Sequence, residues 1–433
     1  MAKNLRTNPR WVAWKSLCQW QEKGWLQDHL ARNSTQLSAA DRAFAWNLAL
    51  GVCRNHLRLA TTVAEYSRKA PKLSVQLALE LGIWQLQEQS RVPTHAAIFE
   101  TVSLIKSQFG AKVGSFGNAM LRRVQRQGWA KLPQDSVKRL SLEYSVQEWL
   151  VRHWLKNLSY EQVDAKLQAA RSIPRQWLRY QPAKISAEDL RQQLNLPEAR
   201  FWGERWLEVG TELAQVLRSE AFAQGLVSVQ NPAADLVVQL LDLQPNQRAW
   251  DACAAPGGKS ALILEREPTA RLWATDVNPR RLQDLQDLEQ RLKLSSFKTQ
   301  VCDLSQDSLT EEFDSILVDA PCSNLGVMSR RPELPLRLRP QDFKALPILQ
   351  LQILSNAARA LKVGGVLVYA TCSPEREEST AVIEKFLAQN PNFRLENAAE
   401  FVDDVWVKNS MILIEPNELG LDEFFAARLR RVK

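Results

Sequence analysis

The chain has 433 residues, of which 45% are hydrophobic and 24% are charged, a composition typical of globular protein with two or three domains. No apolar run approaches the roughly 20 residues that a membrane-spanning helix needs, so we expect no membrane association. The six cysteines are too few and too scattered for a disulfide framework, and none are paired in a CxxC motif. We therefore expect no metal site and a reducing, cytoplasmic location.

Basic charge is concentrated in the first third of the chain. The net charge is +8, but residues 1–140 carry 21 Lys and Arg against 8 Asp and Glu, an excess of 13, so the remainder sums to −5. Such asymmetry is typical of a polyanion-binding module joined to a near-neutral or acidic domain. The alternative is a helical domain with a solvated basic face, which charge alone does not exclude.

Residues 1–140 are predicted to form an all-helical bundle. Trp11, Trp14 and Cys18 are spaced three and four residues apart, which places them on one apolar stripe. Ser38, followed three residues later by an aspartate, is predicted to cap a helix that runs to about residue 51. Two later stretches are also long and periodic, residues 75–87 and 95–109.

Residues 141–225 are predicted to be a small connecting α+β region. The stretch 174–179 has the pattern of a strand that follows a helix. Helices are expected at residues 187–194 and 212–221.

From residue 226 to 433 the pattern alternates between strands and helices. This alternation predicts an α/β, Rossmann-like domain with a doubly wound, mostly parallel sheet. The expected strands are residues 248–253, 271–276, 297–302, 315–319 and 365–370. The expected helices are residues 260–266, 279–292 and 343–361.

Polar residues follow these predicted strands, where open α/β sheets bind ligands. They are Asp251, Asp276, Asp303, Asp319 and Cys372. Gly257 and Gly258 form a turn whose backbone can approach a ligand at the N-terminus of the next helix. The turn lacks the glycine spacing of the ATP-binding P-loop and of the dinucleotide fingerprint, so an adenosine-bearing cofactor of another kind is favoured.

The helical region resembles the NusB-type RNA-binding fold. The resemblance lies in several short pieces in the same order: Arg10, residues 41–44, residues 50–51 and residues 117–122. It implies an RNA-binding role for residues 1–140.

The last 200 residues are similar to RNA 5-methylcytosine methyltransferases in three successive motifs, residues 253–259, 319–323 and 370–373. With the NusB-like front, nearly the whole chain resembles the bacterial 16S rRNA methyltransferase B (Sun/Fmu) family. The resemblance implies that Cys372 is the nucleophile and Cys322 the cysteine that assists release. It also implies an S-adenosylmethionine pocket lined by Cys253, Ala254, Ala255, Pro256, Gly257, Gly258, Lys259, Asp276, Asp303 and Asp319.

The expected chemistry is covalent. Carbon 5 of cytosine is a poor nucleophile, and adding the Cys372 thiolate to carbon 6 gives carbon 5 enamine character so that it can accept a methyl group. Asp319 is the candidate to stabilise charge at N3 of the ring, and Cys322 the candidate to promote elimination of Cys372 afterwards. The target cytosine must be unpaired or flipped out of a helix.

The expected partner is small-subunit rRNA, unassembled or partly assembled, bound by a monomer. Two alternatives remain open: an RNA-binding ribosome-assembly or antitermination factor with a vestigial catalytic domain, and the same chemistry on tRNA. Four places depart from the family pattern and put target choice and rate in doubt: Gln181, Asn231, Asn324-Leu325 and Ser379. Arg330, Arg331, Arg337 and Arg339 are candidates for holding phosphates, with a solvated loop as the equal alternative.

Overall fold

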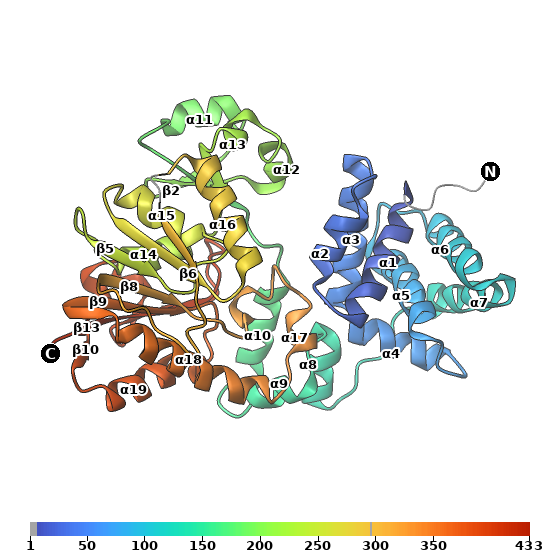
Figure 1. Cartoon of the computed structure of the whole chain (residues 1–433). Helices are drawn as coiled ribbons and strands as arrows, with labels where there is room; N and C mark the ends of the chain where they lie inside the picture. Colours follow the sequence, from blue (N-terminus) through green and yellow to red (C-terminus); the bar gives the residue numbers. More distant parts are fainter. Residues whose placement is uncertain (1–6, 295–296) are drawn as a thin grey trace. The chain divides into compact units, whose positions relative to one another are not determined.

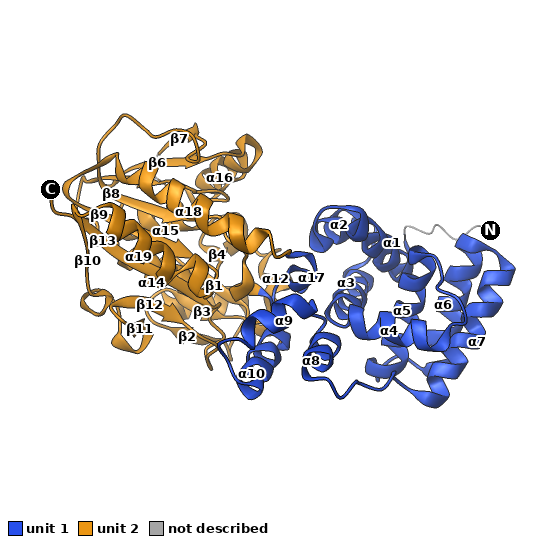
Figure 2. Cartoon of the chain, turned by 90° about the horizontal axis from the view of Figure 1, so that it is seen from below, with its two compact units in different colours: residues 1–172, 328–338 blue, residues 173–327, 339–433 orange. Residues whose placement is uncertain are grey.

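Two units make up the chain in the computed structural model, which describes residues 7–294 and 297–433 (Figure 1). The first, here called the helical unit, contains the chain as far as Ser172 together with residues 328–338. The second, the sheet unit, contains residues 173–327 and 339–433 (Figure 2). In the described residues, no helix has both the length and the apolar character needed to cross a membrane.

The helical unit confirms the all-helical prediction, and Ser38 accepts a hydrogen bond from Asp41 N at 3.1 Å as the predicted cap. The predicted boundary near residue 140 falls inside this unit, because α8 to α10 belong to it. Its long helices are α1 (Pro9–Glu22), α2 (Leu26–Asn33), α3 (Ala39–Arg54), α4 (His56–Tyr66), α5 (Leu73–Glu88), α6 (Thr94–Phe109) and α7 (Ala111–Gln127). They are followed by α8 (Ser136–Tyr144), α9 (Glu148–Trp154) and α10 (Tyr160–Arg171).

Residues 328–338 return to the helical unit from the sheet unit and carry the short helix α17 (Leu334–Arg337). Gln147 anchors this segment, since its backbone N donates to the carbonyl of Pro335 at 3.3 Å. The guanidinium groups of Arg331 and Arg337 lie 5.4 and 4.8 Å from the Trp25 ring. Two of the four predicted phosphate-binding arginines thus pack on an aromatic ring within this unit.

The sheet unit begins with a four-stranded antiparallel sheet of order β2-β3-β1-β4. The strands are β1 (Trp177–Tyr180), β2 (Arg200–Trp202), β3 (Trp206–Glu208) and β4 (Val227–Val229). Helix α11 (Ala187–Leu194) lies where predicted. The predicted helix 212–221 is wrong as one element: Ser219 accepts from Phe222 N at 3.2 Å and caps a new helix, which separates α12 (Leu213–Val216) from α13 (Glu220–Ala223).

A nine-stranded sheet forms the rest of this unit, with the order β11-β12-β13-β9-β8-β5-β6-β7 and β10 paired to β13. The five strands from β9 to β7 are parallel, which confirms the doubly wound prediction. They are β5 (Arg248–Asp251), β6 (Arg271–Asp276), β7 (Lys298–Val301), β8 (Phe313–Asp319) and β9 (Leu361–Thr371). The remaining strands are β10 (Phe393–Leu395), β11 (Val407–Lys408), β12 (Met411–Ile414) and β13 (Phe424–Arg431).

Helices cover both faces of this sheet, so its central strands are apolar on both sides. Val368 and Ala370 pack with the core that includes α14 (Ala233–Gln239) and α15 (Gly258–Arg266), while Leu367 and Tyr369 pack with the core of α18 (Asp342–Ala358) and α19 (Thr380–Gln389). Helix α16 (Pro279–Leu292) follows β6. Leu361, predicted to end a helix, instead pairs with Phe313 and begins β9. Strand order reverses at β5 and β8, the place where such sheets bind ligands.

Candidate active site

The turn after β5 is shaped for close approach of a ligand. Gly257 has φ +101°, and a Cβ there would lie 2.8 Å from Leu285 Cγ, so only glycine fits. Helix α15 begins at Gly258, which directs its first free N–H groups toward the turn. Ala254 and Ala255 are buried, and Pro256 is exposed.

The structure brings Asp276 to this turn. Its Oδ2 accepts from the Ala255 N at 3.2 Å and its Oδ1 accepts from the Asn278 N at 2.9 Å. Asp303 makes its described side-chain hydrogen bonds within its own turn, where Oδ1 accepts from Ser305 N and Oγ at 3.0 and 2.7 Å. The two acids lie after neighbouring strands, since β6 pairs with β7.

Asp251 is the buried member of the strand-end acids. It is 1% exposed, and its Oδ2 accepts from Ser260 Oγ at 2.6 Å. Burial raises the pKa of Asp251 to about 7. Cys253, two residues on, also has its pKa raised well above the usual range, chiefly by burial, so it is a neutral thiol.

Lys259 connects the turn to the motif that contains Cys322. Its Nζ lies 2.6 Å from Asp319 Oδ2. Burial alone would lower the pKa of Lys259, but the Asp319 carboxylate outweighs burial and the pKa is raised. Lys259 is therefore a stable cation that holds the Asp319 carboxyl in place.

The two predicted cysteines meet at the carboxyl ends of adjacent strands. Asp319 of β8 pairs with Ala370 of β9, and the sulfur atoms of Cys322 and Cys372, just beyond, lie 3.2 Å apart. The hydrogen bond with Cys372, followed by burial, raises the pKa of Cys322 well above its usual range. Cys322 is thus a protonated thiol in contact with the second sulfur.

Asn324 is one of the positions where the sequence departs from the family pattern. It has φ +60°, a conformation that asparagine tolerates better than most residues. Its Oδ1 accepts from Cys372 Sγ at 2.9 Å, and its Nδ2 donates to the Cys322 carbonyl at 2.8 Å. The asparagine therefore contacts both cysteines while keeping the backbone shape of the loop.

Gly326 joins this loop to the loop that carries Cys372. Its N donates to the Cys372 carbonyl at 2.9 Å. An added Cβ would lie 2.1 Å from the Glu423 carbonyl oxygen, so no larger residue fits.

The other three residues that depart from the family pattern each form a hydrogen bond with the backbone. Gln181 donates to the Gly225 carbonyl at 3.1 Å, and Asn231 Oδ1 accepts from Ala233 N at 3.0 Å at the start of α14. Ser379 Oγ donates to the Glu375 carbonyl at 2.8 Å.

Glu378 is a residue that the sequence reasoning missed. It is fully buried, and its Oε2 accepts from Ser323 N at 2.8 Å while its Oε1 accepts from Ser373 Oγ at 2.9 Å. Gln350 Nε2 donates to the same Oε2 at 2.9 Å. Since Ser323 follows Cys322 and Ser373 follows Cys372, one carboxyl group holds both cysteine loops.

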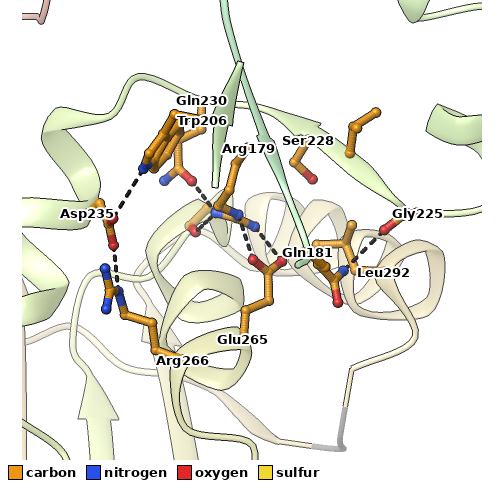
Figure 3. Close-up of polar contacts among 12 residues, drawn as sticks. Arg179, Gln181, Trp206, Gly225, Ser228, Gln230, Asp235, Glu265, Arg266 and Leu292 are labelled. Carbon is orange, nitrogen blue, oxygen red and sulfur yellow. Dashed lines mark hydrogen bonds and ion pairs between the residues drawn. The ribbon is translucent and has the colours of Figure 1, made fainter. Parts of the chain in front are cut away.

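Arg179 of β1 was missed in the same way (Figure 3). It is 1% exposed, and its Nη2 and Nε contact the two carboxylate oxygens of Glu265 at 2.9 and 2.8 Å. Its Nη1 donates to the Gly258 carbonyl at 2.9 Å and to Gln230 Oε1. Through these contacts the small sheet holds the Gly257-Gly258 turn. The sequence did contain one sign of this role: Arg179 is a cation inside a short apolar strand. A charge in such a strand is buried only when it has polar partners.

Two family models match separate parts of the chain. Residues 238–430 match the 16S rRNA methyltransferase RsmB/F model, and residues 7–126 match the NusB family model. These matches agree with the two resemblances expected from the motifs.

Similar proteins align over nearly the full length. The probable ribosomal RNA small subunit methyltransferase B of Bacillus subtilis is 30% identical, over 98% of this chain and 99% of its own. The ribosomal RNA small subunit methyltransferase B of Pseudomonas putida is 33% identical over the same shares.

Solved structures share the fold. The crystal structure of PH0851 has a TM-score of 0.82 at 21% identity and covers 99% of both chains. That of a methyltransferase homolog from Pyrococcus horikoshii has a TM-score of 0.56 at 24% identity, covering 69% of this chain and 100% of its own. Because relatives at 30% identity or more align with nearly all of its residues, the chain belongs to the 16S rRNA methyltransferase RsmB/F family.

Proposed function

We propose that this protein methylates carbon 5 of a cytosine in 16S rRNA, with Cys372 as nucleophile and S-adenosylmethionine as methyl donor. The observation that carries the proposal is the 3.2 Å separation of the Cys322 and Cys372 sulfurs at the ends of β8 and β9. Two thiols in contact at a ligand-binding edge of the sheet suit a reaction of this kind. One sulfur bonds to the base, and the other thiol assists when that bond breaks.

The residues of the cofactor turn fit an adenosine-bearing sulfonium. The Gly257-Gly258 backbone leaves room that a side chain would fill, and Asp276 and Asp303 end neighbouring strands. We assign cofactor contacts to Cys253, Ala254, Ala255, Pro256, Gly257, Gly258, Lys259, Asp276, Asp303 and Asp319. When bound, S-adenosylmethionine supplies an electrophilic methyl group.

The first role of the protein is to activate the base. Cys372 loses its thiol proton to water and the resulting thiolate forms a bond to carbon 6. The electron pair of the carbon 5–carbon 6 double bond then becomes available for attack from carbon 5. N3 of the ring takes up a proton from water as negative charge develops there, and gives it up again when the product forms. The Asp319 carboxylate accepts a hydrogen bond from that N3–H, and Lys259 holds the carboxylate at 2.6 Å.

The second role is to release the product. Carbon 5 loses its proton to water, the double bond to carbon 6 forms again, and the bond from carbon 6 to Cys372 breaks. The raised pKa of Cys322 keeps that thiol protonated, so it donates a hydrogen bond to the departing Cys372 thiolate 3.2 Å away.

A trapping experiment tests these roles. Cys322→Ala, incubated with 16S rRNA and S-adenosylmethionine, is expected to accumulate a protein–RNA adduct that survives a denaturing gel, because release is slowed. The double variant Cys322→Ala/Cys372→Ala is expected to form none. Cys18→Ala, in the half-buried cysteine of α1, is the matched control and is expected to turn over normally.

Persistence of the adduct without Cys372 would refute the nucleophile assignment. RNA binding without cofactor binding would favour an assembly or antitermination factor with a vestigial catalytic domain. Adduct formation with tRNA but not with 16S rRNA would keep the chemistry and replace the substrate.

A further inference from the structure

A cavity of about 900 Å³ opens in the helical unit, and none of the residues proposed for the reaction or for cofactor binding lines it. Its floor is apolar: Val75 and Met120 are buried, and Phe109, Val113 and Phe116 are partly buried. The volume lies within the range of small-ligand sites.

Cations surround the opening. The exposed side chains that line it are Arg68, Lys69, Lys72, Lys112 and Arg123. No lining residue is acidic, and none of the five cations forms an ion pair with another residue in the described part of the chain. By contrast, a 600 Å³ cavity beside the four-stranded sheet is lined by both arginines and glutamates.

Two helix N-termini add to the positive potential. Lys72 is the N-cap of α5 and Lys112 lies in the first turn of α7, and neither helix has a side-chain cap. The free N–H groups and the dipoles of both helices therefore favour an anion at the rim.

Three aromatic rings, Tyr66, Phe109 and Phe116, line the same cavity. The Arg123 guanidinium is 4.7 Å from the centre of the Tyr66 ring, and Phe109 packs edge-on against Trp14 at 5.8 Å, which fixes its ring. An apolar aromatic floor inside a basic rim matches single-stranded nucleic acid, whose flat bases stack on rings while its phosphates need cations.

We propose that this cavity, the base cavity, binds an unpaired nucleotide of the RNA substrate, with the base among Tyr66, Phe109 and Phe116 and the flanking phosphates on the rim lysines and arginines. The proposal rests on the proposed function in so far as the substrate is RNA. It assigns to the helical unit a single-strand contact that is separate from the cysteine pair.

The test measures affinity of the full chain for a fluorescein-labelled 12-nucleotide oligouridylate, which has no cytosine and so cannot report on methylation. Lys72→Gln/Lys112→Gln is expected to weaken binding and to reduce the slope of log K against log salt by about 1.4, since each phosphate contact on a single strand contributes roughly 0.7. Phe116→Leu keeps apolar volume but removes the flat ring, and is expected to weaken binding by about tenfold with the salt slope unchanged.

Lys131→Gln/Lys138→Gln, in two exposed lysines outside the cavity, is the matched charge control. Equal binding and equal slopes for Lys72→Gln/Lys112→Gln and Lys131→Gln/Lys138→Gln would overturn the proposal. So would binding of a peptide of alternating Glu and Leu, lost in the double variant, when oligouridylate does not bind; that result would assign the cavity to a protein partner. Cys372→Ala is expected to bind oligouridylate normally, so failure of the methylation chemistry leaves this test intact.

Discussion

At the scale of single residues, Glu378 shows how one buried carboxyl holds the two loops that carry Cys322 and Cys372. Burial of such a group is costly unless hydrogen bonds replace water, and three donors do so: Ser323 N, Ser373 Oγ and Gln350 Nε2. Two of these donors belong to the loops that carry Cys322 and Cys372. The 3.2 Å sulfur contact therefore depends on Glu378 without any direct contact to it.

Glu378→Gln is expected to lower kcat about 100-fold, because a glutamine places an NH₂ group against one of these donors and displaces a loop by a fraction of an ångström. A second measurement is the rate at which a mild oxidant joins Cys322 to Cys372, which should fall as the sulfurs separate. Glu384→Gln, in an exposed glutamate of α19, is the control for both. Unchanged oxidation in Glu378→Gln would contradict the positioning role.

Asp251 makes stability depend on pH. Its folded pKa of about 7 lies above the unfolded value of about 3.9, so between these values the folded state retains a proton that the unfolded chain has lost. Its contribution to stability therefore falls as pH rises through this window, by at most about 4 kcal/mol, and stays low above it. Asp251→Asn should flatten the fall in Tm between about pH 4 and pH 7, measured calorimetrically at constant ionic strength. Parallel Tm profiles for the two proteins would contradict this.

At the scale of elements, β1 contacts the Gly257-Gly258 turn, the proposed cofactor turn, through Arg179. The two-pronged contact with Glu265 of α15 and the bond to the Gly258 carbonyl need the planar guanidinium. The sheet of β1 to β4 thus supports the turn at Gly258. This role is not evident from the sequence, because Arg179 of β1 is 79 residues away from Gly258 along the chain.

Arg179→Lys is expected to weaken S-adenosylmethionine binding by tenfold or more, measured by calorimetric titration, because one ammonium cannot replace all these contacts. Arg175→Lys, in a partly exposed ion pair with Glu208, is the control and should bind the cofactor normally. Equal affinities in the two variants would show that the turn holds its shape without Arg179.

The elements and the site were predictable from sequence to different degrees. Periodicity and turn residues located β6 and α16 at their observed bounds, and the motifs brought Cys322 and Cys372 to adjacent strand ends. The residues that were not predicted are those whose role depends on burial. In the sequence, Glu378 cannot be distinguished from its charged neighbours, because only the structure shows that it is fully buried. The split of residues 212–221 into two helices followed from a single serine cap that periodicity does not register.

At the scale of the whole molecule, the chain contains a basic helical unit and a sheet unit that carries the Cys322–Cys372 pair. The chain leaves the Cys322 loop at Val327, contributes residues 328–338 to the helical unit and returns at Arg339. From the sequence we predicted consecutive domains. A segment as short as residues 328–338, which belongs to the helical unit, does not change the local composition enough to be recognised. Both units belong to one RNA methyltransferase. For this enzyme we propose a transient bond between Cys372 and the target base.

The most direct measurement of that claim uses the wild-type chain with 16S rRNA in which cytidine is replaced by 5-fluorocytidine. Fluorine at carbon 5 leaves no proton to remove after methyl transfer, so the protein should remain bonded to a methylated base. Mass spectrometry of the digested complex is expected to find the nucleotide and its added methyl group on the peptide that contains Cys372. No adduct, or attachment at Cys322 or any other residue, would contradict the account.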